Sequence, residues 1–123
     1  MKEREEREPS PNEETARRMT PEVIELVARR FWILSEPARL KILGSLLEQE
    51  RTVTELVEDT GLNQANLSKH LQVLRTHGFV ARRKEGLFSY YSVSDASVSR
   101  LCDIMCARLD DRAREQVALL GTP

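Results

Sequence analysis

Residues 62–80, LNQANLSKHLQVLRTHGFV, predict a short amphipathic helix with clear start and stop signals. Asn63 suits the N-cap, because its side chain can accept backbone N–H groups of the first turn. Gly78 stands where a left-handed residue closes a helix. Between them, leucines recur at i, i+4 and i+7, which predicts a stripe buried in a core. These leucines are Leu67, Leu71 and Leu74.

The opposite side of this helix is polar and has no acidic residue. It carries Ala65, Lys69, Gln72 and Thr76, with Gln64, Asn66 and Ser68 near its start. Amides, hydroxyls and a lysine at a helix N-terminus can read base edges and bind phosphates in a DNA major groove. We interpret the segment as a DNA-recognition helix. An ordinary solvated surface helix is the alternative, and this segment alone does not separate the two.

Length and composition indicate one small soluble domain. The 123 residues are 40% hydrophobic and 32% charged. No apolar run approaches the roughly 18 residues that span a bilayer, so we expect no membrane partner. The first residues, MKEREEREPSPNEE, have no apolar stretch and do not resemble a signal peptide. Two cysteines cannot form a disulfide framework, and a cytoplasmic location is expected.

Positive charge is concentrated in one window of the chain. The net charge is only −1 overall, but residues 63–86 hold five basic residues against one acidic residue, a net charge of +4. Residues 52–62, just before, hold three acidic residues and no basic one. A localised basic patch is the electrostatic pattern expected of a DNA-binding protein even when the whole chain is mildly acidic.

Two segments precede the central helices. Residues 1–19 are charge-dense and almost free of apolar side chains, which predicts a mobile arm. The domain itself is expected over residues 20–121. Thr20 as N-cap and Pro21 at the first helical position predict a helix to about Leu34. That helix is apolar on more than one face, which favours burial of a second face against a partner.

The next segments predict a helix-turn-helix. Residues 38–50, ARLKILGSLLEQE, have leucines at helical spacing. Thr52 and Glu55 fit a capping box at the start of a short helix that Gly61 ends. Residues 61–63 then separate two short helices, as in a helix-turn-helix whose second member is the recognition helix.

After Gly78 the pattern changes to the period of two that is typical of strands. Residues 79–84 and 87–93 flank Glu85-Gly86, which predicts a β-hairpin. Three consecutive basic residues precede its tip. A hairpin of this kind after a recognition helix is a wing, which would lie along the DNA backbone or enter the minor groove.

Residues 96–120, ASVSRLCDIMCARLDDRAREQVALL, predict a long last helix that Ser94-Asp95 caps and Gly121 ends. It is long for a chain whose core three other helices already occupy. Pairing with the first helix, and with both copies in a second subunit, is the simplest use for it. Its broad apolar face consists of Val98, Leu101, Cys102, Met105, Cys106, Leu109, Ala113, Val117 and Leu120.

Together these segments resemble the ArsR-type family of winged-helix bacterial repressors. The resemblance rests on LSEPARLKILGSLLEQE (34–50) and VTELVEDTGLNQANLSKHLQVLRTHGFVARRKEGLFSYYSV (53–93). It implies a mainly α fold with a β-hairpin wing, a winged helix-turn-helix. It also implies a helical dimer interface from the first and last helices, and a homodimer that binds double-stranded DNA at an inverted repeat until an inducer releases it.

The resemblance also assigns DNA-binding positions. Gln64, Asn66, Ser68, Lys69 and His70 match the family's DNA-facing helix positions, and Arg82, Arg83 and Lys84 match its wing. His70 falls at the edge of the leucine stripe, so packing with one hydrogen bond is the favoured role from its position alone. Many metal sensors of the family carry Cys-x-Cys in the helix before the recognition helix, where this chain has ELVEDT. Others use Asp and His on the last helix, which has Asp103 but no histidine.

Cys102 and Cys106 are the candidate inducer-binding residues. They are the only cysteines, and four-residue spacing places both thiols on one helical face. A trivalent arsenical, a soft metal ion or an oxidant is the candidate ligand of such a dithiol. Two small apolar side chains packed in a dimer interface are the alternative, slightly favoured on general grounds.

The sequence as a whole predicts a DNA-binding transcriptional regulator, most readily a repressor. No Ser/His/Asp set, carboxylate pair, phosphate-binding glycine loop or cluster of metal ligands is recognisable, so an enzyme is not expected. A winged-helix module used only for protein–protein contact is the alternative. The basic wing beside an acid-free helix face argues against it.

Overall fold

The computed structural model describes residues 7–120, which form two compact units divided after Glu36. In the first unit, α2 (Pro11–Arg18) was not predicted. The Ser10 hydroxyl accepts the Glu13 N–H at 3.2 Å, and acidic residues in the first turn with basic ones in the last complement the helix dipole. A mobile arm over residues 1–19 stays a prediction, and residues 1–6 lie outside the described part.

The helix α3 (Pro21–Leu34) has the predicted start and end. The Thr20 hydroxyl accepts the Val23 N–H at 3.3 Å, and Pro21 stands in the first turn. Among its apolar residues only Ile33 is fully buried. The large apolar side chains of this helix that remain exposed are Ile24, Leu26, Phe31 and Trp32.

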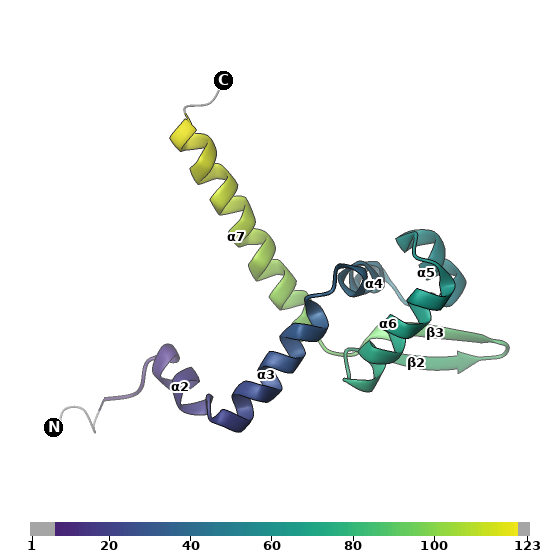
Figure 1. The fold of residues 1–123 in the computed structure, drawn as a ribbon, viewed down its shortest axis with the longest axis horizontal. Coiled ribbons are helices and arrows are strands. Elements are labelled where there is room, and N and C mark those ends of the chain that lie inside the picture. Colours follow the sequence, from purple (N-terminus) through teal and green to yellow (C-terminus); the bar gives the residue numbers. More distant parts are fainter. Residues whose placement is uncertain (1–6, 121–123) are drawn as a thin grey trace. The chain divides into compact units, whose positions relative to one another are not determined.

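The second unit contains the predicted helix-turn-helix, hairpin and last helix (Figure 1). Its elements in order are α4 (Pro37–Glu48), β1 (Arg51–Thr52), α5 (Val53–Thr60), α6 (Gln64–Thr76), β2 (Val80–Glu85), β3 (Phe88–Val93) and α7 (Ser97–Leu120). This arrangement is a winged helix-turn-helix, mainly helical with a small antiparallel sheet.

Both caps of the helix-turn-helix form as predicted. The Thr52 hydroxyl accepts the Glu55 N–H at 3.2 Å, and the Glu55 carboxylate accepts the Thr52 N–H at 3.0 Å. These two bonds complete the capping box. The Thr52 N–H and the Thr52 hydroxyl both donate to the Glu55 carboxylate, and these bonds hold the pKa of Glu55 below its ordinary value. Gly61 ends α5 with φ of +74°, a left-handed conformation that favours glycine.

The predicted leucine stripe of α6 lies in the core. Helix α6 contacts α4 and α5, and its three leucines are at most 2% exposed. Because these leucines face inward, the other side of α6 faces solvent. The buried apolar residues of the second unit are Ile42, Leu43, Leu46, Leu56, Leu67, Leu71, Leu74, Phe79, Val80 and Val98.

The sheet has the order β1-β3-β2, with antiparallel pairs throughout. Strand β1 was not predicted, because two residues are too few for a period-two pattern. The hairpin turn is also one residue later than predicted: Glu85 pairs with Phe88, so Gly86 and Leu87 form the turn. Gly86 has φ of +62°, and the first central position of a type II′ turn requires such an angle.

Helix α7 begins at Ser97, two residues after the predicted cap Ser94-Asp95. The Asp95 carboxylate accepts hydrogen bonds from the N–H and the hydroxyl of Ser97 at 2.9 and 2.6 Å. Only Val98 of this helix is buried, and the predicted stop at Gly121 lies outside the described residues. Between residues 7 and 120, no helix is long and apolar enough to cross a membrane.

The capping box provides a stability test. Thr52→Ala should lower the free energy of unfolding by about 1 kcal/mol, because it removes the oxygen that accepts the Glu55 N–H. Urea denaturation measures the loss. The control is Thr54→Ala, an exposed position on the same helix, where a change within about 0.5 kcal/mol is expected. Equal losses in both variants would contradict a stabilising role of the box.

Candidate nucleic-acid interface

The N-terminal half of α6 presents its polar side chains to solvent. The Asn63 side chain accepts the Asn66 N–H at 2.9 Å, which confirms the predicted N-cap. Four of the five helix positions selected from the sequence are exposed, and all lie within the first two turns. They are Gln64, Asn66, Ser68 and Lys69. An amide-rich helix start of this kind can present several side chains to base edges at once.

His70 differs from these four positions. It is only partly exposed, and its Nδ1 accepts a hydrogen bond from Nε of Arg39 on α4 at 3.2 Å. Packing with one hydrogen bond was the role that its position favoured, and the structure confirms that contact. Because Nδ1 is the acceptor, a neutral His70 carries its proton on Nε2.

The three basic residues of the wing do not share one face. Successive strand residues point to opposite faces, so Arg82 and Lys84 lie on the same face as buried Val80. Arg83 lies on the other face, where its guanidinium stands 4.6 Å from the centre of the Tyr90 ring. The sequence predicted a run of three basic residues near the hairpin tip, but it did not show that Arg83 faces away from the other two.

Arg83 spans the sheet and binds two carboxylates. It forms two hydrogen bonds to Glu50, at 3.0 and 2.5 Å, and one to Glu85 at 2.5 Å. Glu50 precedes β1, whereas Arg83 is on β2, at the opposite edge of the sheet. The bonds from Arg83 hold the pKa of Glu50 below its ordinary value and raise that of Arg83. Arg83 therefore links Glu50, just before β1, to β2, and because two carboxylates balance its charge it has less positive charge to offer a ligand than Arg82.

The sequence predicted no site role for Arg75 or Tyr91, and Gln72 was assigned only to the polar side of α6. In the structure they line one cleft with Arg82 and Ser68, between α6 and the wing. The available signal was spacing, since residues 68, 72 and 75 follow each other at i, i+4 and i+7 on one face of α6. That spacing shows that they share a helix face, but it does not show which strand lies opposite.

The two cysteines lie on α7. Both are free thiols; Cys102 is partly buried and Cys106 is exposed. Residues four apart on a helix have Cβ atoms about 5–6 Å apart, so one ligand could reach both sulfurs. No group of three or more His, Cys, Asp or Glu residues that could hold a metal ion exists within residues 7–120.

Comparison with known proteins agrees with this architecture. Residues 36–82 match the description "bacterial regulatory protein, arsR family". An HTH-type transcriptional regulator of Mycobacterium tuberculosis, Rv0081, is 38% identical over 96 residues, which are 77% of this chain and 84% of that protein. This chain belongs to the arsR family of bacterial regulatory proteins. The crystal structure of Rv0081 covers the same 77% of the chain and 96% of its own, with a TM-score of 0.71 at 36% identity.

Two further similar proteins are a DNA-binding domain and a repressor. A homodimeric winged helix-turn-helix DNA-binding domain from Mycobacterium bovis has a TM-score of 0.69 at 32% identity, covering 77% of this chain and 88% of that one. A probable mercury resistance operon repressor of Streptomyces lividans is 43% identical over 81 residues, which are 66% of this chain and 63% of that protein. This arsR-family chain is thus a member of a group of DNA-binding transcriptional regulators.

The contact between Arg83 and Glu50 can be tested by titration. In Arg83→Gln, the pKa of the Glu50 carboxyl should rise toward the ordinary value of 4.5, because the side-chain hydrogen bond is the main cause of its lowering. NMR titration of side-chain carboxyl carbons measures this pKa. Arg82→Gln removes the same charge from the same strand and should leave the Glu50 pKa low. A similar rise in both variants would contradict the direct contact.

Proposed function

We propose that this arsR-family regulator represses transcription as a homodimer bound to an inverted-repeat operator. In this proposal α6 of each subunit enters a major groove, and each wing lies along the neighbouring sugar–phosphate backbone. Gln64, Asn66, Ser68 and Lys69 contact bases or phosphates from α6, and Arg82 and Lys84 bind phosphates from the wing. Two copies are needed because one recognition helix covers too few base pairs for useful specificity.

The exposed face of α6 is the observation that carries this proposal. Three leucines anchor the helix in the core, so its amides, hydroxyls and lysine are turned to solvent without an acidic neighbour on the helix. Acidic side chains would repel DNA, whereas amides and hydroxyls can bind both base edges and phosphates. A module used only for protein contacts would have no need of this composition beside the cations of Arg82 and Lys84.

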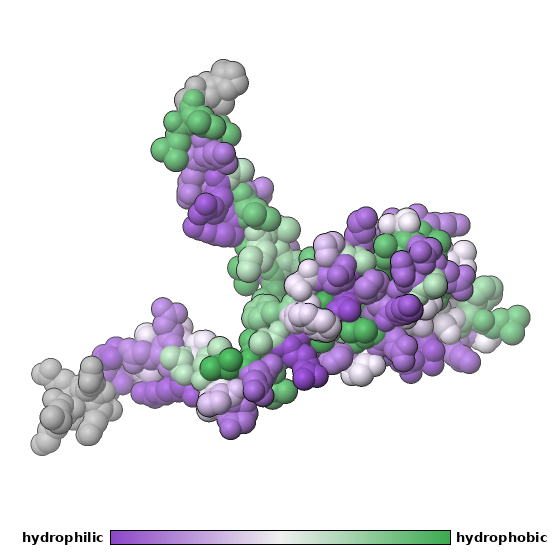
Figure 2. All heavy atoms as spheres, viewed as in Figure 1, coloured by the Kyte–Doolittle hydropathy of each residue, from purple (hydrophilic) through white to green (hydrophobic). Residues whose placement is uncertain are grey.

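Exposed apolar side chains support a dimer. Ile104, Met105 and Leu109 on α7 are between 62% and 68% exposed, although an apolar side chain gains free energy when it is buried. Figure 2 shows apolar surface (green) on the lower part of α7 and at its far end, with a hydrophilic stretch (purple) between them. The helix α3, considered by itself, likewise exposes large side chains such as Phe31 and Trp32. Large apolar side chains left exposed in this way on a helix commonly mark a protein–protein interface.

Cys102 and Cys106 are the proposed inducer-binding residues. Their spacing allows one thiophilic ligand to bridge both sulfurs, and the exposure of Cys106 within a single subunit gives the ligand access. The mercury resistance repressor among the relatives supports a soft thiophile. Thiolate ligands select soft ions over hard ones such as Mg²⁺. An arsenite that binds three sulfurs would need a cysteine of the second subunit, since one chain provides two.

Release would follow from a change in helix packing. The cysteines are on α7 and the base-reading side chains are on α6, so a ligand at the thiols does not contact DNA. It would shift the packing of the α7 helices in the dimer, and with it the separation of the two recognition helices. Cysteines that serve only as small packing residues in the interface remain the alternative, because free cysteine is often buried for that reason.

DNA selection from a random pool, together with a duplex from upstream of the protein's own gene, tests the operator. Gln64→Ala and Asn66→Ala should relax sequence preference, each by about 1–3 kcal/mol if its contact is bidentate. Lys84→Ala should weaken binding equally on all duplexes and reduce the salt slope by about 0.9. Sedimentation should show a dimer on each duplex. A monomer with and without DNA, or equal sequence-blind losses from both sets of variants, would contradict the proposal.

The thiol proposal is tested with a Cys102→Ser, Cys106→Ser double variant. It should bind the selected duplex as tightly as the wild type but no longer release it when Hg²⁺ or phenylarsine oxide is added. Each single variant should lose most of the response, because a bridging ligand needs both sulfurs. Mg²⁺ is the control ion and should release neither protein. If the double variant still releases DNA to the same ligand, the cysteines are packing residues.

A further inference from the structure

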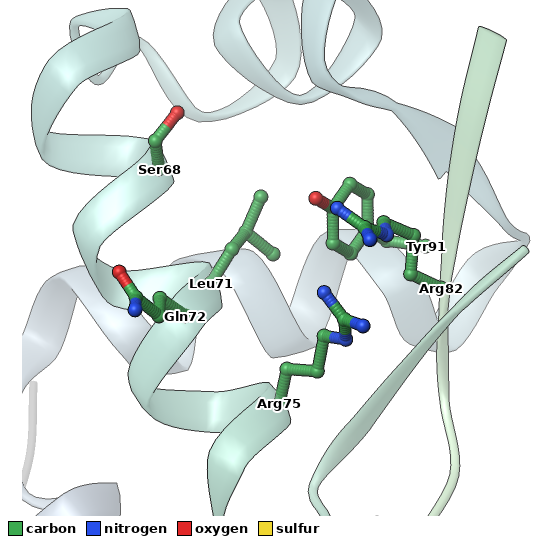
Figure 3. Close-up of a pocket in the computed structure, with 6 residues that line it drawn as sticks. All are labelled: Ser68, Leu71, Gln72, Arg75, Arg82 and Tyr91. Atoms are coloured by element: carbon green, nitrogen blue, oxygen red, sulfur yellow. The ribbon is translucent and has the colours of Figure 1, made fainter.

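A cleft of about 310 Å³ lies between α6 and the wing (Figure 3). Figure 3 shows Arg75 reaching from α6 toward the strands, where the guanidinium of Arg82 and the ring of Tyr91 lie. Leu71 forms the apolar floor. The side chains that line the cleft are Ser68, Leu71, Gln72, Arg75, Arg82 and Tyr91. All but one of these six carry a hydrogen-bond donor, and none is acidic.

Regular secondary structure places these side chains together. Residues 68, 71, 72 and 75 are spaced at i, i+3, i+4 and i+7, so they form one face of α6. Arg82 on β2 is paired with Tyr91 on β3, and paired residues project from the same face of a sheet. That face is the one that buries Val80 against the core. The cleft therefore extends the packed interface between α6 and the sheet, but hydrogen-bond donors line it where apolar side chains fill the core.

Arg75 on α6 and Arg82 on β2 differ from Arg51 and Arg83 in having no carboxylate partner within residues 7–120. Arg83 binds Glu50 and Glu85, and Arg51 binds Glu48 at 2.7 Å. By contrast, within the described residues neither Arg75 nor Arg82 has a side-chain hydrogen bond or an ion pair. Two guanidinium groups that share one cleft repel each other, and an anion bound between them adds two attractions that outweigh this repulsion. The planar fork of arginine matches the oxygens of phosphate and carboxylate groups.

We propose that this cleft binds one phosphate of the DNA backbone where the strand passes between α6 and the wing. The inference rests on the proposed function and adds Arg75, Gln72 and Tyr91 to its contacts. Arg75 and Arg82 bind the charged oxygens, and hydroxyl or amide donors beside them complete the contact. One phosphate held by helix and wing together fixes the register of α6 in the groove, as backbone contacts commonly do.

A DNA phosphodiester is favoured over a free anion by the position of the cleft. The cleft lies between the two elements that the proposed function places on DNA, and its arginines, Ser68 and Gln72 are all exposed. A polymer held at both sides of the cleft brings its phosphate without the full entropic cost of binding a free ion, because neighbouring contacts already position the strand.

Affinity measurements on the selected duplex test the two arginines. Arg75→Gln and Arg82→Gln should each weaken binding about ten-fold, as loss of a hydrogen bond to a charged group does. The double variant should lose less than the hundred-fold product, because both side chains bind the same phosphate. Arg100→Gln, an exposed position on α7, removes one charge outside the cleft and should bind like the wild type. All three positions are exposed, and a melting curve confirms that each of the four variants is folded.

A duplex with one neutral methylphosphonate in place of a phosphate locates the contact. Scanned along each half-site, it should reveal one position at which the wild type loses about ten-fold and the double variant loses nothing further. Multiplicative losses from the two arginines, or no position of this kind, would overturn the shared phosphate. Arginine variants that bind DNA as tightly as Arg100→Gln would overturn the cleft as a DNA site while leaving the proposed function intact. Failure of the wild type to bind any duplex would instead reject the proposed function.

Titration with inorganic phosphate separates the two sources of the anion. The Nε–H signals of Arg75 and Arg82 are followed by NMR at constant ionic strength. Saturable shifts should be absent below about 10 mM inorganic phosphate, because a lone ion lacks the neighbouring contacts of the strand. The same signals should shift when the duplex is added. Saturation by inorganic phosphate at lower concentration would overturn the assignment to DNA and identify a site for a free anion.

Discussion

Burial of the leucine stripe of α6 is the constraint on which the rest of the site depends. Leu67, Leu71 and Leu74 pack into the core formed with α4 and α5, and this fixes the rotation of α6 about its own axis. An amphipathic helix has one rotation that buries its apolar stripe, so the same packing determines which side chains face solvent. The polar face of α6 points to solvent because exposing the three leucines of the opposite face would cost the free energy gained by their burial.

The wing depends on the same core through its first residues. Phe79 and Val80 are buried where β2 leaves α6, and strand alternation then carries the orientation of Val80 to Arg82 and Lys84. The residue between them, Arg83, necessarily projects from the other face, where it reaches Glu50 across the central strand. One arginine thus stabilises the sheet while its neighbour faces the cleft beside α6. Arg82 and Arg83 are adjacent in the sequence, but the alternation of side chains along a strand places them in different surroundings.

The long α7 contributes little to the core of its own subunit. Val98 is its only buried residue, and from residue 103 to residue 120 every side chain is exposed, including the apolar ones. A helix of 24 residues with such a surface needs a partner for that surface, which a second subunit supplies in the proposed dimer. The thiols lie on this helix rather than on α6. A ligand there would act on the arrangement of subunits and not on the base contacts.

Local signals in the sequence were sufficient for most elements of the second unit. The caps at Thr52 and Asn63, the glycines after α5 and α6, and the leucine spacing depend on interactions within a few residues, so the sequence predicts them directly. Signals of the same short range also occur at α2, where Ser10 caps the helix and the terminal charges match its dipole, but the interpretation of this segment was based on its polar composition alone. The hairpin register failed by one residue because the turn type depends on where glycine falls within it.

Pairings between distant residues were decided only by the tertiary structure. The sequence by itself determined the helix-turn-helix, the existence of a wing and the polar face of α6. It did not show that β1 joins the sheet, that Arg83 binds Glu50 or that Arg75 shares a cleft with Arg82. Those partners are separated by 7 to 40 residues along the chain. Only core packing and strand register bring them together, because no local periodicity encodes which surface a side chain meets.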